Sequence, residues 1–517
     1  MMSSPIKTKQ SGRFFTIFIL FFIIATIVPF LPVNIILLVL GGMVGTAVLL
    51  LFIQRPQWFI FFLIFYIPLE EFIQKWIPRG TLYEIARFGG EGLLLIILLF
   101  VLLEKMRRGF LWQRNPLDLP LLLFFIVVFV SGIINKTPLI VGLLGIRPLI
   151  RYVMVYYILV QMGVSQKFFQ KSIKWTYIVA ATVVFIGLLQ TIIGMPLTQL
   201  LIPGDVLIGD VVARQGLRHV VSARTFIFST LGRYDTLGIY LSLHLLVAYA
   251  LLGVADKPHK RYLRLFILFA LFALILTYSR QSWIVLILGL GIISFLSPRR
   301  LFVQTRLVYI LIALLLPMLY FVLRPYAAYL GAAAGVDASV FERIVEPLSP
   351  QYIQVSRYSY GRLFVIFEVG SRLLSLAPIW GLGPGQFGSL VTRFFGIPFN
   401  DVVGVPDSAA HFINDVNWII ILGQVGLAGV ITYLAIYLNL AKSAYRYSYK
   451  IKQTTYWREK GVALGYVACI FVFLILGFFG PNFEVRQSSF YIWLWGGLLI
   501  GRRYNTDPFN ANNDPQE

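Results

Sequence analysis

Arginines at the ends of long apolar runs are the first feature of this sequence that could do chemistry. The guanidinium group offers a planar fork of N–H donors that binds phosphate oxygens in pairs, whereas the lysine ammonium acts as a point charge. The arginines placed in this way are Arg147, Arg151, Arg224, Arg280 and Arg362. They predict a site for a phosphate or pyrophosphate group, unless they serve only to anchor helix ends or to pair with acidic side chains.

The apolar runs beside these arginines are long enough to cross a lipid bilayer. Hydrophobic residues make up 58% of the 517 positions and charged residues only 13%, with a mean hydropathy of +0.81. A membrane-crossing helix needs roughly 20 mostly apolar residues, and its backbone hydrogen bonds are satisfied within the helix. The predicted fold class is therefore an all-α, polytopic transmembrane helix bundle of about 12–14 spans. The spans are predicted near 14–30, 33–53, 57–69, 85–103, 117–134, 148–162, 173–194, 235–254, 262–278, 282–297, 307–323, 414–440, 462–480 and 487–501.

Basic residues assign a side of the membrane to each loop, because cytoplasmic loops carry an excess of lysine and arginine. With the N-terminus inside, the densest basic clusters all fall on the cytoplasmic side, within 105–114, 257–264 and 442–460. Both termini are then predicted to be cytoplasmic. The formal net charge of +22 lies mostly next to membrane spans, so anionic lipid head groups, and not nucleic acid, are the predicted partners.

The same assignment places two long segments outside, 195–234 and 324–412, and loops of this length usually carry a binding or catalytic element. Within the second, Tyr360–Leu376 is predicted to form a helix that ends before Pro378. Of the 18 basic residues assigned to the outer side 16 are arginine, which favours an outward-facing phosphate ligand. The predicted divisions are 1–194, 235–323 and 413–501 for transmembrane helices, 195–234 and 324–412 for extracytoplasmic loops, the larger with short helices, and 502–517 for a cytoplasmic tail.

Metal chemistry and disulfides are not indicated. Cys469 is the only cysteine and lies within an apolar run. The four histidines, His219, His244, His259 and His411, form no HExxH-type ligand cluster. We predict no metal site and no cofactor.

Four local patterns resemble the O-antigen ligase and O-antigen polymerase family of bacterial membrane glycosyltransferases. They are FSTLGRYDTLGIYLSLHL at 228–245, LTYSRQSWIVLILGLG at 276–291, GRLFVIFEV and PIWGLGPGQFG between 361 and 388, and NDVNWIIILGQVGLAGV at 414–430. The patterns occur in the family's order, and together they cover roughly the part of the chain from 225 to 440.

The resemblance implies transfer of a glycan from undecaprenyl pyrophosphate to an acceptor sugar hydroxyl at the outer face of the bacterial cytoplasmic membrane. The implied reaction inverts the anomeric carbon, needs no metal ion and belongs to the biosynthesis of a surface polysaccharide such as O-antigen, capsule or exopolysaccharide. The implied partners are the lipid-linked glycan donor, a glycan or lipid-glycan acceptor, and membrane lipids. Ligase and polymerase activity both remain open.

The family's site residues can be matched to this sequence one by one. Arg280 in TYSR corresponds to the family arginine at the outer end of a span. Arg362 corresponds to the arginine of the large loop that holds the second phosphate, with Arg357 and Arg372 as nearby competitors. Arg224 completes the predicted pyrophosphate-binding set.

A glycine-dense turn follows Arg362 in the family and in this sequence. Gly381, Gly383 and Gly385, with Pro384, are expected to bring the backbone close to substrate, because glycine tolerates positive φ and close approach. The alternative is a tight turn between the loop and the next helix.

The catalytic base departs from the commonest family pattern. Ligases place a histidine eleven residues before the glycine that corresponds to Gly426, and this chain has Asp415 there. His411 lies four residues upstream. Either Asp415 as a carboxylate or His411 as a neutral imidazole could accept a hydroxyl proton. Asp415 could also cap the span that begins at Val416, and the two roles are compatible.

A further candidate site and a second function class complete the predictions. Arg233 and Asp235 stand at the outer start of a span and form a third-ranked site, because ionisable residues in membrane segments are functional candidates. Four outer carboxylates are expected to partner arginines: Glu70, Glu71, Glu84 and Glu91.

The alternative function is a transporter of lipid-linked saccharide or of a small anion such as bicarbonate, although the sequence shows no internal repeat of the kind many transporters have.

Overall fold

The computed structural model describes residues 45–77, 81–109, 112–203, 206–208, 211–214, 226–297, 350–358, 360–406, 410–451 and 456–506. Arg224, the predicted spans 14–30 and 307–323, most of the span 33–53 and the tail from 507 lie outside the described residues. The chain divides into two compact units, Met1–Phe59 and Ile60–Glu517. The described part of the first unit contains the helix Gly45–Gln54 and the start of α3, where Phe52 packs on Phe59 at a ring separation of 5.2 Å.

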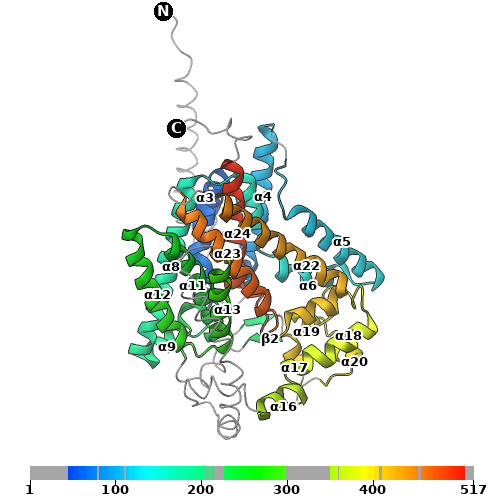
Figure 1. Cartoon of the computed structure of the whole chain (residues 1–517). Coiled ribbons are helices and arrows are strands. Elements are labelled where there is room, and N and C mark those ends of the chain that lie inside the picture. The colour runs from blue at the N-terminus through cyan, green and yellow to red at the C-terminus, as the bar shows by residue number, and fades with distance from the viewer. Residues whose placement is uncertain are drawn as a thin grey trace, which may run out of the picture. The chain divides into compact units, whose positions relative to one another are not determined.

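The described chain is almost entirely helical (Figure 1). Its longer helices are α3 Pro56–Gln74, α4 Thr81–Arg107, α5 Asp118–Ile134, α6 Leu139–Ile150, α7 Val153–Met162, α8 Gln166–Ile193, α11 Tyr234–Val254, α12 Lys257–Leu276, α13 Arg280–Leu296, α22 Asn417–Lys450, α23 Trp457–Leu476 and α24 Arg486–Thr506. Its shorter elements are α9 Met195–Leu201, β1 Val206–Ile208, β2 Val211–Arg214, η2 Ser229–Leu231, α16 Pro350–Tyr358, α17 Arg362–Phe364, η5 Val365–Val369, α18 Gly370–Leu376, α19 Leu390–Phe394, α20 Phe399–Val403 and α21 Ala410–Ile413.

The helices confirm an all-α, multi-pass membrane fold. Within the described ranges, five helices are long and apolar enough to cross a membrane, namely α3, α8, α11, α22 and α23. The pair α6 and α7 passes the same test together and is bent by 62° at the residues between them, as in a broken span or a re-entrant loop. Helices α4, α5, α12, α13 and α24 coincide with the other predicted spans in the described ranges.

Helix α11 lies at the centre of the bundle and is buried along almost its whole length. A helix that is apolar on all sides is stable only when other helices surround it. Small residues allow the close approach: Gly238 of α11 meets Ser279 and Ser282 at the start of α13, and Gly465 of α23 lies against Val247. In membranes such small-residue contacts let helix backbones pack directly against one another.

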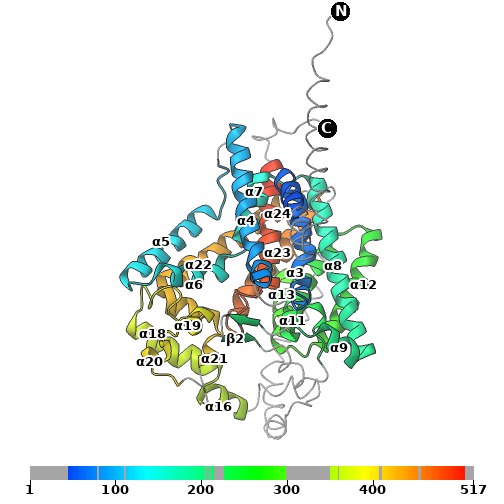
Figure 2. The same ribbon diagram turned by 180° about the vertical axis from the view of Figure 1, so that it is seen from behind.

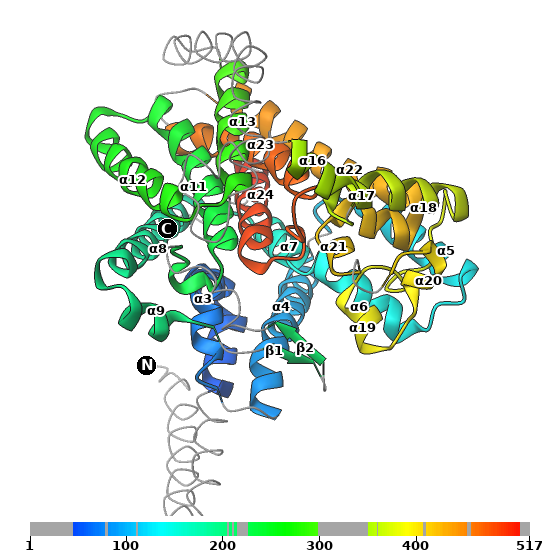
Figure 3. The ribbon, with the colours of Figure 1, turned by 90° about the horizontal axis from the view of Figure 1, so that it is seen from below.

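The short helices of the large loop gather beside α22 and α5, as Figures 2 and 3 show from two directions. A cluster of buried apolar side chains joins them to the start of α22, and it includes Val365, Leu373, Phe387, Phe399 and Ile419. The predicted helix at Tyr360–Leu376 is confirmed as the succession α17, η5 and α18, and η5 is a π-helical turn. The strands β1 and β2 form a short antiparallel pair.

Helix α22 is broken at Gly426, where φ is 66° and ψ is −168°. The segment after α18 fills the break with backbone hydrogen bonds on both sides of it. Leu382 N donates to Gly423 O at 2.7 Å, and Gly383 N donates to Gln424 O at 3.0 Å. On the far side, Leu427 N donates to Pro378 O at 2.9 Å. The glycine-dense turn of the large loop is thereby fixed to the middle of a membrane helix.

We expect Gly426→Ala to destabilise the protein, because the backbone conformation is accessible essentially only to glycine and a Cβ atom would collide with the backbone of Ile379. The loss should be about 1–3 kcal/mol, seen as a lower thermal unfolding temperature in detergent. Gly90→Ala in α4 is the matched control, because the space around its Cβ position is open. Equal unfolding temperatures for the two variants would show that the break does not constrain the fold.

Candidate functional site

Arg362 and Asp415 come together across the large loop. Arg362 is the first residue of α17, and Asp415 lies in the turn between α21 and α22. The Arg362 Nη2 atom donates to Asp415 Oδ2 at 3.3 Å, with 42% and 37% of the two side chains exposed. The Arg362 Nε atom is buried and makes no hydrogen bond to a described atom. Arg362 and Asp415, which come from separate motifs, therefore face each other. The Arg362 Nε–H group remains available to a further acceptor.

Asp415 is not the cap of α22. The helix begins at Asn417, its cap residue is Val416, and no side chain bonds to its free N–H groups. The Asp415 backbone N–H donates instead to Phe412 O at 3.1 Å, and its carboxylate is directed to Arg362. The side chain of His411, in α21, lies outside what the structure describes, so the choice between Asp415 and His411 stays open.

Arg233 and Asp235 form a two-pronged ion pair at the start of α11. Arg233 Nε donates to Asp235 Oδ1 at 3.0 Å, and Arg233 Nη2 donates to Asp235 Oδ2 at 2.7 Å. The pKa of Arg233 is raised, chiefly by the Asp235 carboxylate and to a smaller extent by that of Asp415. Arg233 is therefore within electrostatic range of Asp415.

Arg280 is the first residue of α13 and is half-buried. The turn before it packs on α11, since Ser279 and Ser282 share a hydrogen bond of 2.7 Å and both lie against Gly238. Ser242 of α11 also donates to the Ser282 carbonyl at 2.9 Å. This packing places Arg280 beside the end of α11 that carries Arg233 and Asp235.

Several other arginines of the predicted outer side have partners among the described residues. Glu91 of α4 pairs with Arg147 at 3.2 Å and with Arg151 at 2.8 Å, and Arg151 is only 8% exposed. Arg357 pairs with Glu368 at 3.0 Å. The same holds for Arg372, whose Nη1 donates to the carbonyls of Val403 and Gly404, and for Arg486, which pairs with Glu70. These contacts hold Arg147, Arg151, Arg357 and Arg372 to neighbouring segments, although Arg357 Nη1, like Arg362 Nε, is buried without a hydrogen bond to a described atom.

The three glycines of the turn use their backbone N–H groups within the protein. Gly381 N donates to Ala377 O at 3.1 Å, Gly383 N to Gln424 O at 3.0 Å and Gly385 N to Gln424 Oε1 at 3.0 Å. All three residues have positive φ, and a Cβ atom at any of them would collide with a neighbour. The tight-turn alternative thus accounts for these glycines, and a direct role in holding substrate stays a prediction.

Glu484 is a site residue that sequence reasoning missed. It lies in the turn between α23 and α24, where Asn417 Nδ2 donates to Glu484 Oε1 at 3.3 Å and Phe483 N donates to Asn417 Oδ1 at 2.9 Å. Burial raises the pKa of Glu484 to about 7, against the opposing effect of Arg151. A carboxyl group that titrates near neutral pH is suited to proton transfer. A lone glutamate in a short turn gave no signal in the sequence.

Metal ligands are a separate question for this site. Among the side chains that the structure describes, no group of three or more His, Cys, Asp and Glu residues is arranged to hold a metal ion.

The fold and the described helices define the chain as a multi-pass α-helical membrane protein. No protein-family model matches its sequence, and no curated protein matches it either.

We expect Glu484→Gln to stabilise the protein at pH 8 and to leave its stability at pH 4 unchanged. The folded-state pKa of about 7 lies above the ordinary value of 4.5. Between these two values the folded state keeps a proton that the unfolded chain releases, so the stability of the wild type falls as pH rises. The amide stays neutral throughout, and its oxygen can still accept from Asn417.

Thermal unfolding in detergent between pH 4 and pH 8 measures the effect, with the exposed Asp401→Asn as the control. If the curves of wild type and Glu484→Gln ran parallel over this range, Glu484 would not be a buried carboxyl of raised pKa.

Proposed function

We propose that this protein transfers or polymerises a glycan from undecaprenyl pyrophosphate onto an acceptor sugar hydroxyl at the outer face of the bacterial cytoplasmic membrane. The observation that carries the proposal is the Arg362–Asp415 pair, which joins a potential phosphate ligand to a potential base at the large loop. The product would be a surface polysaccharide. The proposal leaves open whether the reaction is a ligation or a polymerisation.

The negative charge of the pyrophosphate leaving group explains why arginine is suited to this site. When the bond between the anomeric carbon and the pyrophosphate oxygen breaks, negative charge grows on the departing phosphate. Fixed guanidinium donors in a site shielded from water stabilise such charge strongly. Arg362 would hold one phosphate, Arg280 and Arg224 are proposed to bind the pyrophosphate with it, and Arg233 lies near enough to add to the positive potential.

The acceptor needs a base on the other side of the reacting carbon. The base takes the proton of the acceptor hydroxyl, the oxygen attacks the anomeric carbon, and undecaprenyl pyrophosphate leaves from the opposite face with inversion. Asp415 and His411 are the proposed bases, and Glu484 is a second carboxyl close to them through Asn417. No step requires a metal ion.

The resting ion pair suggests how substrate could prepare the site. A partly exposed salt bridge contributes only about 0–1 kcal/mol, so a pyrophosphate can replace Asp415 as the partner of Arg362 at little cost. The displaced carboxylate is then free to accept a proton. Binding of the donor would in this way convert Asp415 from a structural partner into a base.

The alternative function, transport of a lipid-linked saccharide or a small anion, draws on the break between α6 and α7. The two helices are bent by 62°, and the buried Arg151 at the break pairs with Glu91. Interrupted helices with charged residues at the break are typical of transporter binding sites. The large loop and its ion pair favour chemistry at the outer surface instead.

The test is glycan transfer in vitro by the purified protein, with a donor linked to undecaprenyl pyrophosphate, candidate acceptors and a chelator. We expect Arg362→Gln and Asp415→Asn each to lower turnover by about 100-fold or more, because each removes a charge that acts in the transition state. Arg357→Gln is the matched control, since it breaks an ion pair of similar exposure in the same loop, and it should keep turnover within a few-fold of the wild type.

Full activity in Asp415→Asn with loss in His411→Ala would move the base to His411, and loss in Glu484→Gln alone would move it to Glu484. Absence of product with every acceptor, combined with uptake of an anion or lipid-linked saccharide into proteoliposomes, would replace the enzyme with the transporter.

A further inference from the structure

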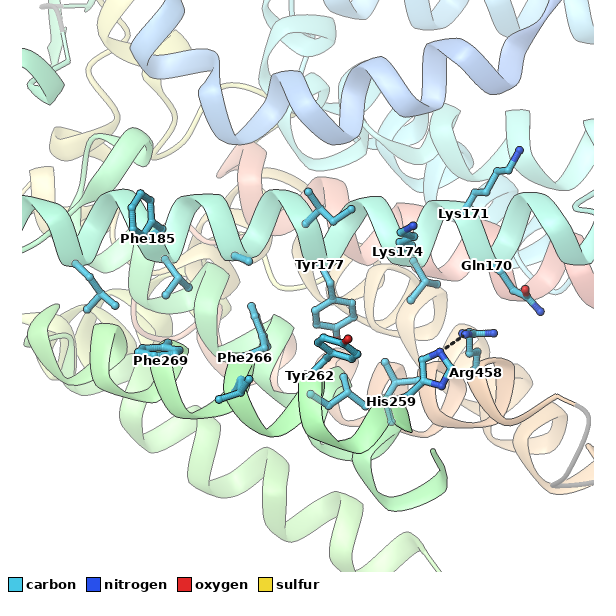
Figure 4. Close-up of a pocket in the computed structure, with 18 of the residues that line it drawn as sticks. Gln170, Lys171, Lys174, Tyr177, Phe185, His259, Tyr262, Phe266, Phe269 and Arg458 are labelled. Carbon is cyan, nitrogen blue, oxygen red and sulfur yellow. Dashed lines mark hydrogen bonds between the residues drawn. The ribbon is translucent and has the colours of Figure 1, made fainter. Parts of the chain in front are cut away.

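A long groove runs between α8 and α12 (Figure 4). Neither Arg362 nor Asp415 lines it. Its volume is about 1130 Å³. The α8 side of the groove is a single stripe at helical spacing, which is basic in its first two turns and apolar beyond them. The stripe consists of Lys167, Lys171, Lys174, Ile178, Ala181, Phe185, Leu188 and Ile192.

The basic end of the groove is completed from two other helices. Figure 4 shows His259 of α12 and Arg458 of α23 at the same end as Lys171 and Lys174. Arg458 Nη2 lies 3.0 Å from His259 Nε2, and His259 Nδ1 lies 2.5 Å from Asp256 Oδ1. Arginine can only donate, so Nε2 is the acceptor and the Nδ1 proton is donated to Asp256. His259 thereby links Arg458 to Asp256.

This end of the groove carries more cationic side chains than carboxylates. Lys171 and Lys174 are exposed and make no ion pair with a carboxylate in the part of the chain that the structure describes. The Arg458 guanidinium stacks over Trp457 at 4.6 Å and keeps its charge. The one acidic side chain in this hydrogen-bonded chain is Asp256. The end of the groove is therefore a positively charged pocket at the predicted cytoplasmic surface.

The rest of the groove is apolar and faces the bilayer. Phe185 of α8 and Phe269 of α12 are 61% and 51% exposed, and Figure 4 shows them at the end away from the lysines. From Lys174 to Ile192 the helix rises about 27 Å, which is longer than one leaflet of a hydrocarbon core of about 30 Å. A molecule with an anionic head and apolar chains matches this arrangement of charge and surface.

We propose that the groove between α8 and α12 binds an anionic phospholipid of the cytoplasmic leaflet, with its phosphate at Lys171, Lys174 and Arg458 and its acyl chains against Tyr177, Phe266 and Phe185. The site differs from that of the proposed donor, whose pyrophosphate would lie at the outer face. The proposal does not depend on the enzymatic function.

The charge of the groove argues against a helix of this chain as the occupant. The two predicted spans outside the described residues, 14–30 and 307–323, both carry basic residues at their cytoplasmic ends, among them Lys9, Arg13 and Arg306. Either span would bring further positive charge to the lysines. A phosphodiester neutralises them instead, and each basic residue near a membrane surface contributes about 1 kcal/mol to the binding of anionic lipid.

The test is a titration of the full-length protein in detergent with phosphatidylglycerol or phosphatidylcholine, followed by native mass spectrometry. We expect phosphatidylglycerol to bind the wild type more tightly, and the triple variant K171Q/K174Q/R458Q to weaken its binding on the order of 100-fold. The control K442Q/R446Q/K450Q removes equal charge from the exposed cytoplasmic end of α22 and should bind as the wild type does. Equal loss in the two triple variants, or equal binding of the two lipids by the wild type, would overturn the proposal.

Two further measurements test the groove itself. Ala181→Trp should fill it and weaken binding of phosphatidylglycerol, whereas the neighbouring Thr182→Trp, outside the groove lining, should not. Cys469 is buried, so an engineered pair such as L20C/F269C reports cleanly on the N-terminal span. Efficient disulfide formation by this pair would show that the chain fills its own groove, which would contradict the lipid site.

Discussion

The break in α22 at Gly426 is the constraint on which the position of the large loop depends. A membrane helix that loses its regular conformation leaves backbone N–H and C=O groups without partners, and in a bilayer each such group costs several kcal/mol. The segment from Pro378 to Gly383 supplies those partners, with Ser131 of α5 donating to Trp380 O and Gln424 O from the other side. The loop cannot leave this position without exposing the break. Arg362, on the helix before the turn, is held opposite Asp415, on the turn that precedes α22.

Hydropathy and charge were sufficient to predict the helical framework. Every predicted span in the described ranges coincides with a helix or with the broken pair α6 and α7, because an apolar run of this length has only one way to satisfy its backbone in lipid. The helix at Tyr360–Leu376 was also predictable, from its composition and the proline beyond its end. The close approach of Gly385 to Gly145 of α6 was not, since the two positions are far apart in the sequence.

The candidate site was predictable only in part, because the sequence shows residue types and not their partners. It could not separate Arg362 from Arg357 and Arg372. In the structure Arg372 donates to two backbone carbonyls, whereas Arg357 and Arg362 each pair with a carboxylate. The same reason explains why Asp415 was considered a helix cap and why Glu484 went unnoticed. Glu484 gains its raised pKa from burial where its turn meets the start of α22, and that environment exists only in the folded bundle.

The two faces of the membrane use their cations in different ways. On the predicted outer face, arginines with glutamate or aspartate partners bring together α3 with α24, α4 with the α6–α7 break, and the large loop with α22. Such pairs fix geometry, because the guanidinium fork is directional. At the predicted cytoplasmic end of α8, Lys171 and Lys174 make no ion pair with a described carboxylate, and an ammonium group adapts to a mobile head group at little geometric cost. The bias towards arginine among the predicted outer residues is thus partly structural, because several of these arginines pair with carboxylates on neighbouring segments.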